Sequence, residues 1–178
     1  YFLAAEKTFD EYLAAGTITL CADAVEEKYL AGVKNIVKAD VKGLKLTYSA
    51  LNGTGYRIIP KLLREEGVEE LTLVREQCAP DGNFPTCPYP NPEIFEALRL
   101  GLELAEKSGA DLMLATDPDA DRVGIAVKCK DGSYELLSGN EVGVLLLDYI
   151  CAGRIEQGTM PKDPVMCKSI VSTPLADK

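Results

Sequence analysis

The chain has 178 residues, of which 28 are acidic and 19 are basic, giving a formal net charge of −9. This balance argues against a nucleic-acid-binding surface, because phosphate backbones are met by clustered lysine and arginine and the sequence has no such cluster. Hydrophobic residues make up 47% of the chain, enough for a packed core, and no apolar run approaches the roughly 20 residues of a membrane span. We expect a soluble globular protein without nucleic-acid or membrane partners.

The cysteines and the first residues indicate a cytoplasmic protein. Six cysteines occur without any Cys-x-x-Cys pair, which disfavours a zinc or redox motif and favours reduced thiols. The N-terminal segment is interrupted by charged residues, unlike a secretion signal. A disulfide between Cys78 and Cys87, which flank a turn-rich loop, is left open by the sequence.

Two amphipathic helices are predicted at the N-terminus. Apolar residues at helical spacing indicate helices over residues 2–15 and 23–37, and Asp23 is the predicted N-cap of the second. We interpret residues 1–22 as a linker helix that precedes an α/β domain at residues 23–137.

Strands and helices alternate through this domain. Short apolar segments predict three strands, and segments with helical spacing predict two helices between them: strands at residues 44–50, 70–74 and 111–115, helices at residues 56–63 and 93–107. Asn91 is the predicted N-cap of the second helix, whose buried face would carry Ile94, Leu98, Leu102 and Ala105, and Ser108-Gly109 is its predicted stop. Helical crossovers between strands favour an α/β layered sandwich, with a mostly parallel mixed sheet and helices on both faces.

A β-hairpin is predicted to complete the domain. The turn at residues 117–121 is short enough to reverse the chain, so a strand at residues 123–127 should run antiparallel to the one before it. Asp131-Gly132 is a strong two-residue turn, which predicts that residues 133–137 pair back onto that strand.

A second α/β domain is predicted to begin near residues 137–139 and to occupy residues 138–178. Gly139-Asn140-Glu141 opens a very apolar helix, predicted to be buried and to end near Gly153. Residues 165–171 are predicted to form a further strand.

Three carboxylates at alternate positions follow the third predicted strand: Asp117, Asp119 and Asp121. On a turn they repel one another unless a cation lies between them, and hard oxygen donors without nearby His or Cys suit Mg²⁺. The adjacent Arg122 carries a guanidinium fork suited to a phosphate. A calcium EF-hand is excluded, because its sixth and twelfth positions would be Arg122 and Lys128 instead of Gly and Glu. The alternative is a solvated acidic turn with Pro118 as its corner.

Five segments follow one another in a specific order: Leu-Asn-Gly-Thr-Gly at 51–55, Pro-Asp-Gly-Asn-Phe-Pro at 80–85, Pro-Asn-Pro-Glu at 90–93, Thr-Asp-Pro-Asp-Ala-Asp-Arg at 116–122 and Gly-Asn-Glu at 139–141. Together they resemble the alpha-D-phosphohexomutase family, in particular its phosphoglucomutase and phosphomannomutase branch. The resemblance runs from about Val25 to the C-terminus. It implies the second of four family domains and the opening of the third. The family often has glycine at the positions of Pro118 and Ala120.

The resemblance also implies an activity for the parent protein. This is reversible transfer of phosphate between the 1- and 6-positions of a hexose phosphate, with glucose the expected hexose, through a phosphoserine and a 1,6-bisphosphate. Asp117, Asp119 and Asp121 would hold Mg²⁺, and Arg122 would contact the phosphate. The chain has no His and no Ser-His-Asn loop, so the nucleophile should lie in another domain and the chain alone should be inactive. Its partners would be the remaining domains and a phosphosugar.

Some segments of the sequence fit more than one interpretation. The turn at residues 52–55 could cradle a phosphate with its N–H groups or could be an ordinary strand-to-helix turn, which the resemblance places near a domain interface. The resemblance suggests interdomain packing for Gly139-Asn140-Glu141. The chain could also be a catalytically silent interaction domain, or a stand-alone Mg²⁺-dependent phosphatase-like domain in which Lys128 is the nearby basic residue.

Overall fold

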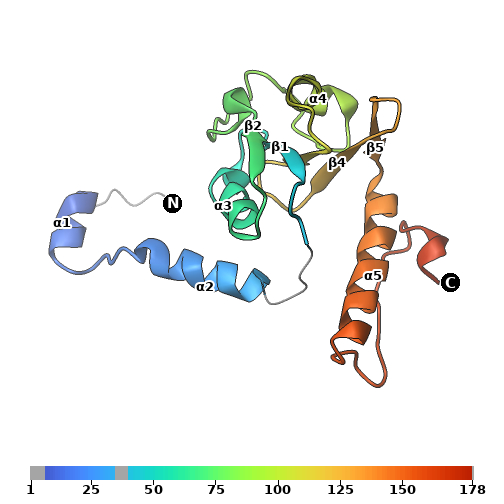
Figure 1. Cartoon of the computed structure of the whole chain (residues 1–178). Coiled ribbons are helices and arrows are strands. Elements are labelled where there is room, and N and C mark those ends of the chain that lie inside the picture. Colours follow the sequence, from blue (N-terminus) through green and yellow to red (C-terminus); the bar gives the residue numbers. More distant parts are fainter. Residues whose placement is uncertain (1–6, 35–39, 178) are drawn as a thin grey trace. The chain divides into compact units, whose positions relative to one another are not determined.

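The structure is a computed structural model that describes residues 7–34 and 40–177 (Figure 1). The chain divides into two compact units, residues 1–35 and residues 36–178. The first unit contains the helices α1 (Phe9–Ala14) and α2 (Ala22–Lys34), and the second contains a five-stranded sheet, its covering helices and a C-terminal helix. None of the described helices combines the length and the apolar character needed to cross a membrane.

Helix α1 begins later than predicted, because a capping box fixes its start. The Glu11 backbone N–H donates to the Thr8 hydroxyl at 3.3 Å, and the Thr8 backbone N–H donates to the Glu11 carboxylate at 2.7 Å. These two bonds satisfy amide groups that the first helical turn leaves without partners. The predicted start at residue 2 is therefore wrong for residues 7 and 8, while residues 2–6 lie outside the described part.

Helix α2 also differs from its prediction at the N-terminus. Asp23 lies in the first turn of the helix instead of at the N-cap. An acidic side chain is favourable there too, because it faces the positive end of the helix dipole. The predicted end at residue 37 lies outside the described residues.

The second unit is built on one mixed sheet of five strands: β1 (Lys45–Ser49), β2 (Glu70–Leu73), β3 (Leu112–Thr116), β4 (Val123–Lys128) and β5 (Tyr134–Leu137). Their order across the sheet is β2-β1-β3-β4-β5. Strand β1 pairs parallel with both β2 and β3, whereas β4 pairs antiparallel with β3 and β5. The predicted reversal after the third strand and the hairpin around Asp131-Gly132 are confirmed.

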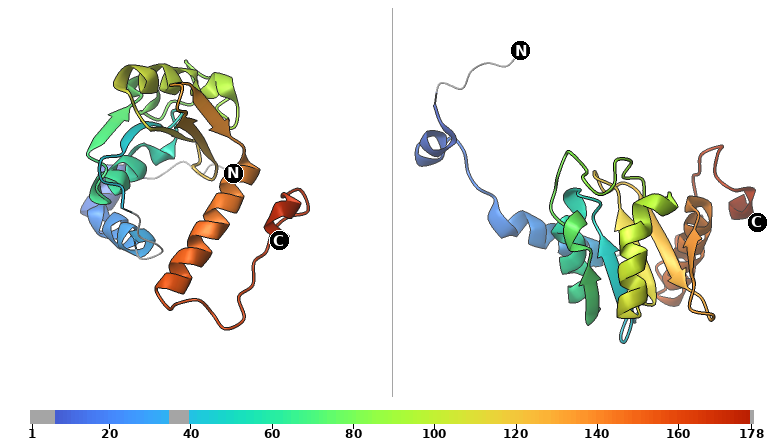
Figure 2. Two further views of the ribbon diagram at one scale, coloured as in Figure 1. Left: turned by 45° about the vertical axis from the view of Figure 1, so that its right-hand side comes forward. Right: turned by 90° about the horizontal axis from the view of Figure 1, so that it is seen from above.

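Two helical crossovers place helices on both faces of this sheet. Helix α3 (Ile58–Glu65) connects β1 to β2, and helix α4 (Phe95–Ser108) connects β2 back across β1 to β3. Because the two connections run in opposite directions and crossovers are right-handed, they must lie on opposite faces. The ribbon shows α3 and α4 on either side of the sheet (Figures 1 and 2). The predicted α/β sandwich with a mixed sheet is confirmed.

The main core lies between α4 and the strands beneath it. Leu98, Leu102 and Ala105 of the helix are buried, as predicted, together with Met113 and Ala115 of β3. The helix ends at Gly109 in the left-handed conformation, with φ of 69°, which confirms the predicted stop.

The start of α4 differs from the prediction by two residues. The Asn91 side chain accepts a hydrogen bond from the Glu93 N–H at 3.0 Å, and the Ile94 N–H donates to the Asn91 carbonyl at 3.0 Å. Asn91 therefore caps a tight turn that precedes the helix, which begins at Phe95. As a result Ile94 is exposed and is not part of the core, contrary to its prediction.

Helix α5 (Gly139–Glu156) follows β5 directly and is longer and more exposed than predicted. Ser138 and Glu141 form a capping box, and the helix continues through Gly153 to Glu156. Of its apolar side chains Val142 is buried, whereas Leu145, Leu146 and Tyr149 are exposed. The prediction of a buried helix is therefore wrong over the described residues. The predicted domain boundary at residues 137–139 coincides with the junction between β5 and α5 and stays a prediction.

The strand predicted at residues 165–171 does not form. The segment has no regular structure, and the side chains of Val165, Ile170 and Val171 are 87%, 98% and 83% exposed. A strand needs a neighbour for its backbone N–H and C=O groups, and none of the five described strands pairs with this segment. The chain ends in a short 3₁₀ turn, Pro174–Asp177.

All six cysteines are free thiols, so the disulfide left open between Cys78 and Cys87 does not form in this structure. Burial raises the pKa of both thiols, which keeps them in the neutral form at pH 7.

The packing of α4 can be tested by truncating one core side chain. Leu98→Ala should lower the free energy of unfolding by about 2–5 kcal/mol, because it leaves a cavity between α4 and the sheet. The matched control Leu145→Ala, on the exposed side of α5, should change it by no more than about 0.5 kcal/mol. Urea unfolding followed by circular dichroism measures both, and equal losses would contradict this placement of the core.

Candidate metal site

The acidic loop, residues 117–122, joins β3 to β4 at the carboxyl end of β3. Thr116 pairs with Val123 across the two antiparallel strands, so the loop must reverse the chain within six residues. Asp117 is completely buried, whereas Asp119 and Asp121 are exposed. One ligand oxygen from each of the three carboxylates lies within 4.8 Å of the others. In the part of the chain that the structure describes, this is the one such group of three metal-ligating side chains.

Arg122 holds Asp117 in place through two hydrogen bonds. The Arg122 backbone N–H donates to Asp117 Oδ1 at 3.0 Å, and the Arg122 Nε–H donates to Oδ2 at 2.8 Å. Burial by itself would raise the pKa of Asp117, but these hydrogen bonds and the guanidinium charge outweigh it and leave the pKa below its ordinary value. Asp117 is therefore ionised at neutral pH despite its burial.

Asp121 shows the opposite effect. The negative charges of Asp119 and Asp117 raise its pKa, while the positive charge of Arg122, whose Nε lies 3.7 Å from Asp121 Oδ1, acts against that increase. Carboxylate repulsion therefore exceeds the compensation that Arg122 supplies. A cation between the three side chains would relieve the remaining repulsion.

The structure pairs Arg122 with a carboxylate of its own loop. Its guanidinium was predicted to contact a phosphate, and about half of the side chain stays exposed while Nε is bonded to Asp117. The phosphate contact stays a prediction. The pairing with Asp117 was not predicted, although two oppositely charged residues five positions apart on one turn are a signal for it.

The turn at residues 52–55 packs against the acidic loop. The Thr54 N–H and hydroxyl both donate to the Pro118 carbonyl, at 2.8 and 3.1 Å. The Asn52 and Gly53 N–H groups donate to the carbonyls of Gln77 and Ala50. Because these three amides are bonded within the protein, the structure disfavours the interpretation of this turn as a phosphate cradle and assigns it a bracing contact instead.

Three other segments lie at the same edge of the sheet: residues 80–85, 90–93 and 139–141. The Asp81 N–H donates to the Asn52 carbonyl at 3.1 Å, which joins the segment at 80–85 to the turn. A Cβ atom on Gly139 would lie 2.8 Å from Glu93 Oε1, so α5 begins beside the segment at 90–93. Parallel strands gather ligand-binding loops at their carboxyl ends, and this edge is such a position.

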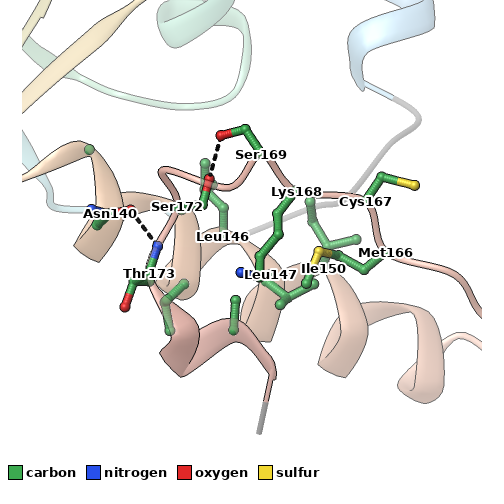
Figure 3. Close-up of a pocket in the computed structure, with 14 residues that line it drawn as sticks. Asn140, Leu146, Leu147, Ile150, Met166, Cys167, Lys168, Ser169, Ser172 and Thr173 are labelled. Carbon is green, nitrogen blue, oxygen red and sulfur yellow. Dashed lines mark hydrogen bonds between the residues drawn. The ribbon is translucent and has the colours of Figure 1, made fainter.

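A separate pocket of about 490 Å³ lies between α5 and residues 166–176 (Figure 3). Leu146, Leu147, Ile150 and Met166 give it an apolar lining, and the Thr173 N–H donates to Asn140 Oδ1 at 2.9 Å at one end. None of its lining residues belongs to the acidic loop, so we do not assign it to the candidate metal site.

The electrostatic coupling within the loop can be tested in the metal-free chain. Asp119→Asn should lower the pKa of Asp121 toward its ordinary value, because it removes the largest cause of the increase. Ionisation of Asp121 destabilises the folded chain as the pH rises through its raised, folded-state pKa, and the variant should lose less stability over that range. NMR titration of the carboxyl carbons with chelator present measures the shift.

Asp131 is the internal control for this titration. Hydrogen bonds from the hydroxyl and N–H of Ser133 lower its pKa, and it should titrate identically in both proteins. An unchanged Asp121 pKa would show that Asp119 and Asp121 do not approach each other in solution.

Comparison with known proteins identifies the family. The family model for phosphoglucomutase/phosphomannomutase, alpha/beta/alpha domain II, matches residues 27–132, more than half of the chain. Phosphoglucomutases of Staphylococcus aureus strains MRSA252 and USA300 are both 39% identical to it over 153 residues, which are 85% of this chain and 27% of each relative. The chain thus spans 27% of the length of these curated relatives.

Solved structures agree with this assignment. A phosphoglucomutase/phosphomannomutase family protein from Burkholderia thailandensis superimposes with a TM-score of 0.52 at 29% identity, over 62% of this chain and 22% of that one. A protein from Thermus thermophilus has a TM-score of 0.56 at 24% identity, over 75% of this chain and 29% of that one, and shows the same fold. The chain therefore belongs to the phosphoglucomutase/phosphomannomutase family and contains its α/β/α domain II.

Proposed function

We propose that the chain is part of a magnesium-dependent phosphohexomutase that interconverts hexose 1-phosphate and hexose 6-phosphate. The observation that carries the proposal is the convergence of Asp117, Asp119 and Asp121 at the carboxyl edge of the sheet, in a domain of this family. Glucose is the hexose we propose, because the similar S. aureus proteins are named phosphoglucomutases.

The residues of the loop fit a magnesium ion. All three ligands are carboxylate oxygens, the donors that Mg²⁺ prefers. Each Asp117 oxygen accepts one hydrogen bond from Arg122 and has a second lone pair for a cation. The raised pKa of Asp121 reflects uncompensated negative charge at the same place. When bound there, Mg²⁺ would stabilise charge on a phosphoryl group in transfer.

The roles of the chain's own residues follow from their contacts. Asp117, Asp119 and Asp121 would hold the ion and leave its remaining positions to water or to an oxygen of a phosphoserine in another domain. Arg122 keeps Asp117 ionised and oriented, and the exposed half of its side chain would contact the same phosphate. The phosphate would move between the 1- and 6-positions through a 1,6-bisphosphate, in a site completed by the remaining domains of a cytoplasmic parent protein.

Weak metal binding by the 178-residue chain is the first consequence. Mn²⁺, as a probe for Mg²⁺, should bind through the acidic loop, weakly because the protein supplies few ligands. Asp119→Asn should weaken binding by at least about tenfold, or about 1.4 kcal/mol. Asp131→Asn, which removes an acid from the turn after β4, should bind as the wild type does. Calorimetric titration measures all three proteins, and equal affinities of wild type and Asp119→Asn would rule out the assignment.

In the full-length parent protein, Asp121→Ala should lower turnover of glucose 1-phosphate on the order of 100-fold, because one ligand of the charge-stabilising ion is lost. Arg122→Lys should cause a smaller loss, since it keeps the charge but not the planar fork. Thermal melting of Asp121→Ala should barely change, because this side chain is exposed and repelled by its neighbours.

A coupled assay at saturating Mg²⁺ measures the turnover, with the 178-residue chain as a comparison that should show none. Normal turnover by Asp121→Ala would contradict the role of the three carboxylates. Turnover by the 178-residue chain would contradict the proposal that the nucleophile lies in another domain.

A further inference from the structure

Gly53 lies so close to the acidic loop that no side chain fits between them. A Cβ atom at this position would clash with Pro118 Cα and would lie 2.6 Å from the Pro118 carbonyl oxygen. The φ of Gly53 is −109°, a value that other residues adopt readily, so the glycine is required by the close approach and not by its own backbone conformation. The obstacle is backbone, which cannot rotate away as a flexible side chain can.

Thr54 binds the one backbone polar group that Pro118 has. Proline has no N–H, so its carbonyl is its only hydrogen-bonding group, and the Thr54 N–H and hydroxyl together occupy both lone pairs of that oxygen. Pro118 lies between Asp117 and Asp119 in the chain. These two bonds therefore fix the peptide that sets the spacing of the first two carboxylates.

The turn that makes these contacts is itself held firmly. Leu51 and Asn52 both adopt the left-handed conformation, with φ of 45° and 57°, which persists only where surrounding contacts enforce it. The buried Asn52 side chain supplies such contacts, because its Nδ2 donates to the carbonyls of Ala79 at 2.8 Å and Glu76 at 3.2 Å. Bonds to Pro118 thus connect the acidic loop to a rigid support.

The acidic loop requires such support. Ala120 adopts a left-handed conformation, with φ of 60°, which is unfavourable for a residue with a Cβ atom. Its N–H donates to the Asp117 carbonyl at 3.0 Å, and a loop relaxed at Ala120 would lose that bond. The two hydrogen bonds from Thr54 hold Pro118, which lies between Asp117 and Ala120 in the chain.

We propose that Gly53 and Thr54 are positioning residues for the metal-binding loop: they hold the Pro118 peptide so that Asp117, Asp119 and Asp121 converge on one cation. This inference rests on the proposed function, since it takes the three carboxylates as metal ligands. Neither residue contacts the ion. Their effect is on how much the loop must reorganise when the ion binds.

The test compares Mn²⁺ affinity with thermal stability in variants of the 178-residue chain. Thr54→Val removes the hydroxyl and keeps the shape and the N–H, so it should weaken Mn²⁺ binding by about 2- to 10-fold. Thr54→Ser keeps the hydroxyl and should restore wild-type affinity. Gly53→Ala should weaken binding more than Thr54→Val does, because it displaces backbone. Its matched control is Gly82→Ala, where a Cβ atom meets open space, and this variant should bind as the wild type does.

Electron paramagnetic resonance gives the affinities, measured well below the melting temperature of each variant. Weaker binding by a fully folded Thr54→Val, reversed in Thr54→Ser, would support the inference even if Gly53→Ala failed to fold. Wild-type affinity in Thr54→Val would overturn the inference and leave the proposed function intact. Absence of Mn²⁺ binding by the wild type would overturn both.

Discussion

The candidate site depends on one buried charge, the carboxylate of Asp117, and on the two hydrogen bonds from Arg122 that keep it ionised. A buried carboxylate without such partners would take up a proton or destabilise the fold. The pairing of β3 with β4 reverses the chain within six residues and so brings Arg122 within hydrogen-bonding distance of Asp117. Asp119 and Asp121 are then left at the surface, close to Asp117 and to each other. The negative charge that remains there is what a divalent cation would neutralise.

The topology of the sheet brings the supporting segments to this loop. Strand β3 has a parallel neighbour, β1, on one side and an antiparallel neighbour, β4, on the other. The turn that follows β1 therefore emerges beside the loop that follows β3, and Gly53 and Thr54 reach Pro118 directly. Strands β3 and β5 run in the same direction, because β4 is antiparallel to both. The capped start of α5, which follows β5, therefore lies at the same edge of the sheet. The acidic loop, the turn that contacts it and the start of α5 thus lie at one edge of this domain.

Local patterns predicted the elements whose structure is determined locally. The spacing of apolar residues predicted the five strands and α4, and Asp131-Gly132 predicted the hairpin. Both predictions succeeded because turn type and strand alternation depend on residues that are adjacent in the sequence. The strand predicted at residues 165–171 failed because an apolar run becomes a strand only beside a pairing partner. The spacing of the three aspartates predicted the site residues, but it did not predict the hydrogen bonds between Arg122 and Asp117. The contact of Thr54 with Pro118 joins residues 64 positions apart, and no local pattern specifies such a contact.

The central claim, that Asp117, Asp119 and Asp121 together hold a divalent cation, is tested most directly by anomalous diffraction from crystals of the chain soaked in Mn²⁺. We expect a single Mn²⁺ peak within coordination distance of one oxygen of each carboxylate. We also expect Arg122 Nε to stay bonded to Asp117. Absence of a peak at the loop, or a peak bonded to Asp119 and Asp121 without Asp117, would contradict the claim.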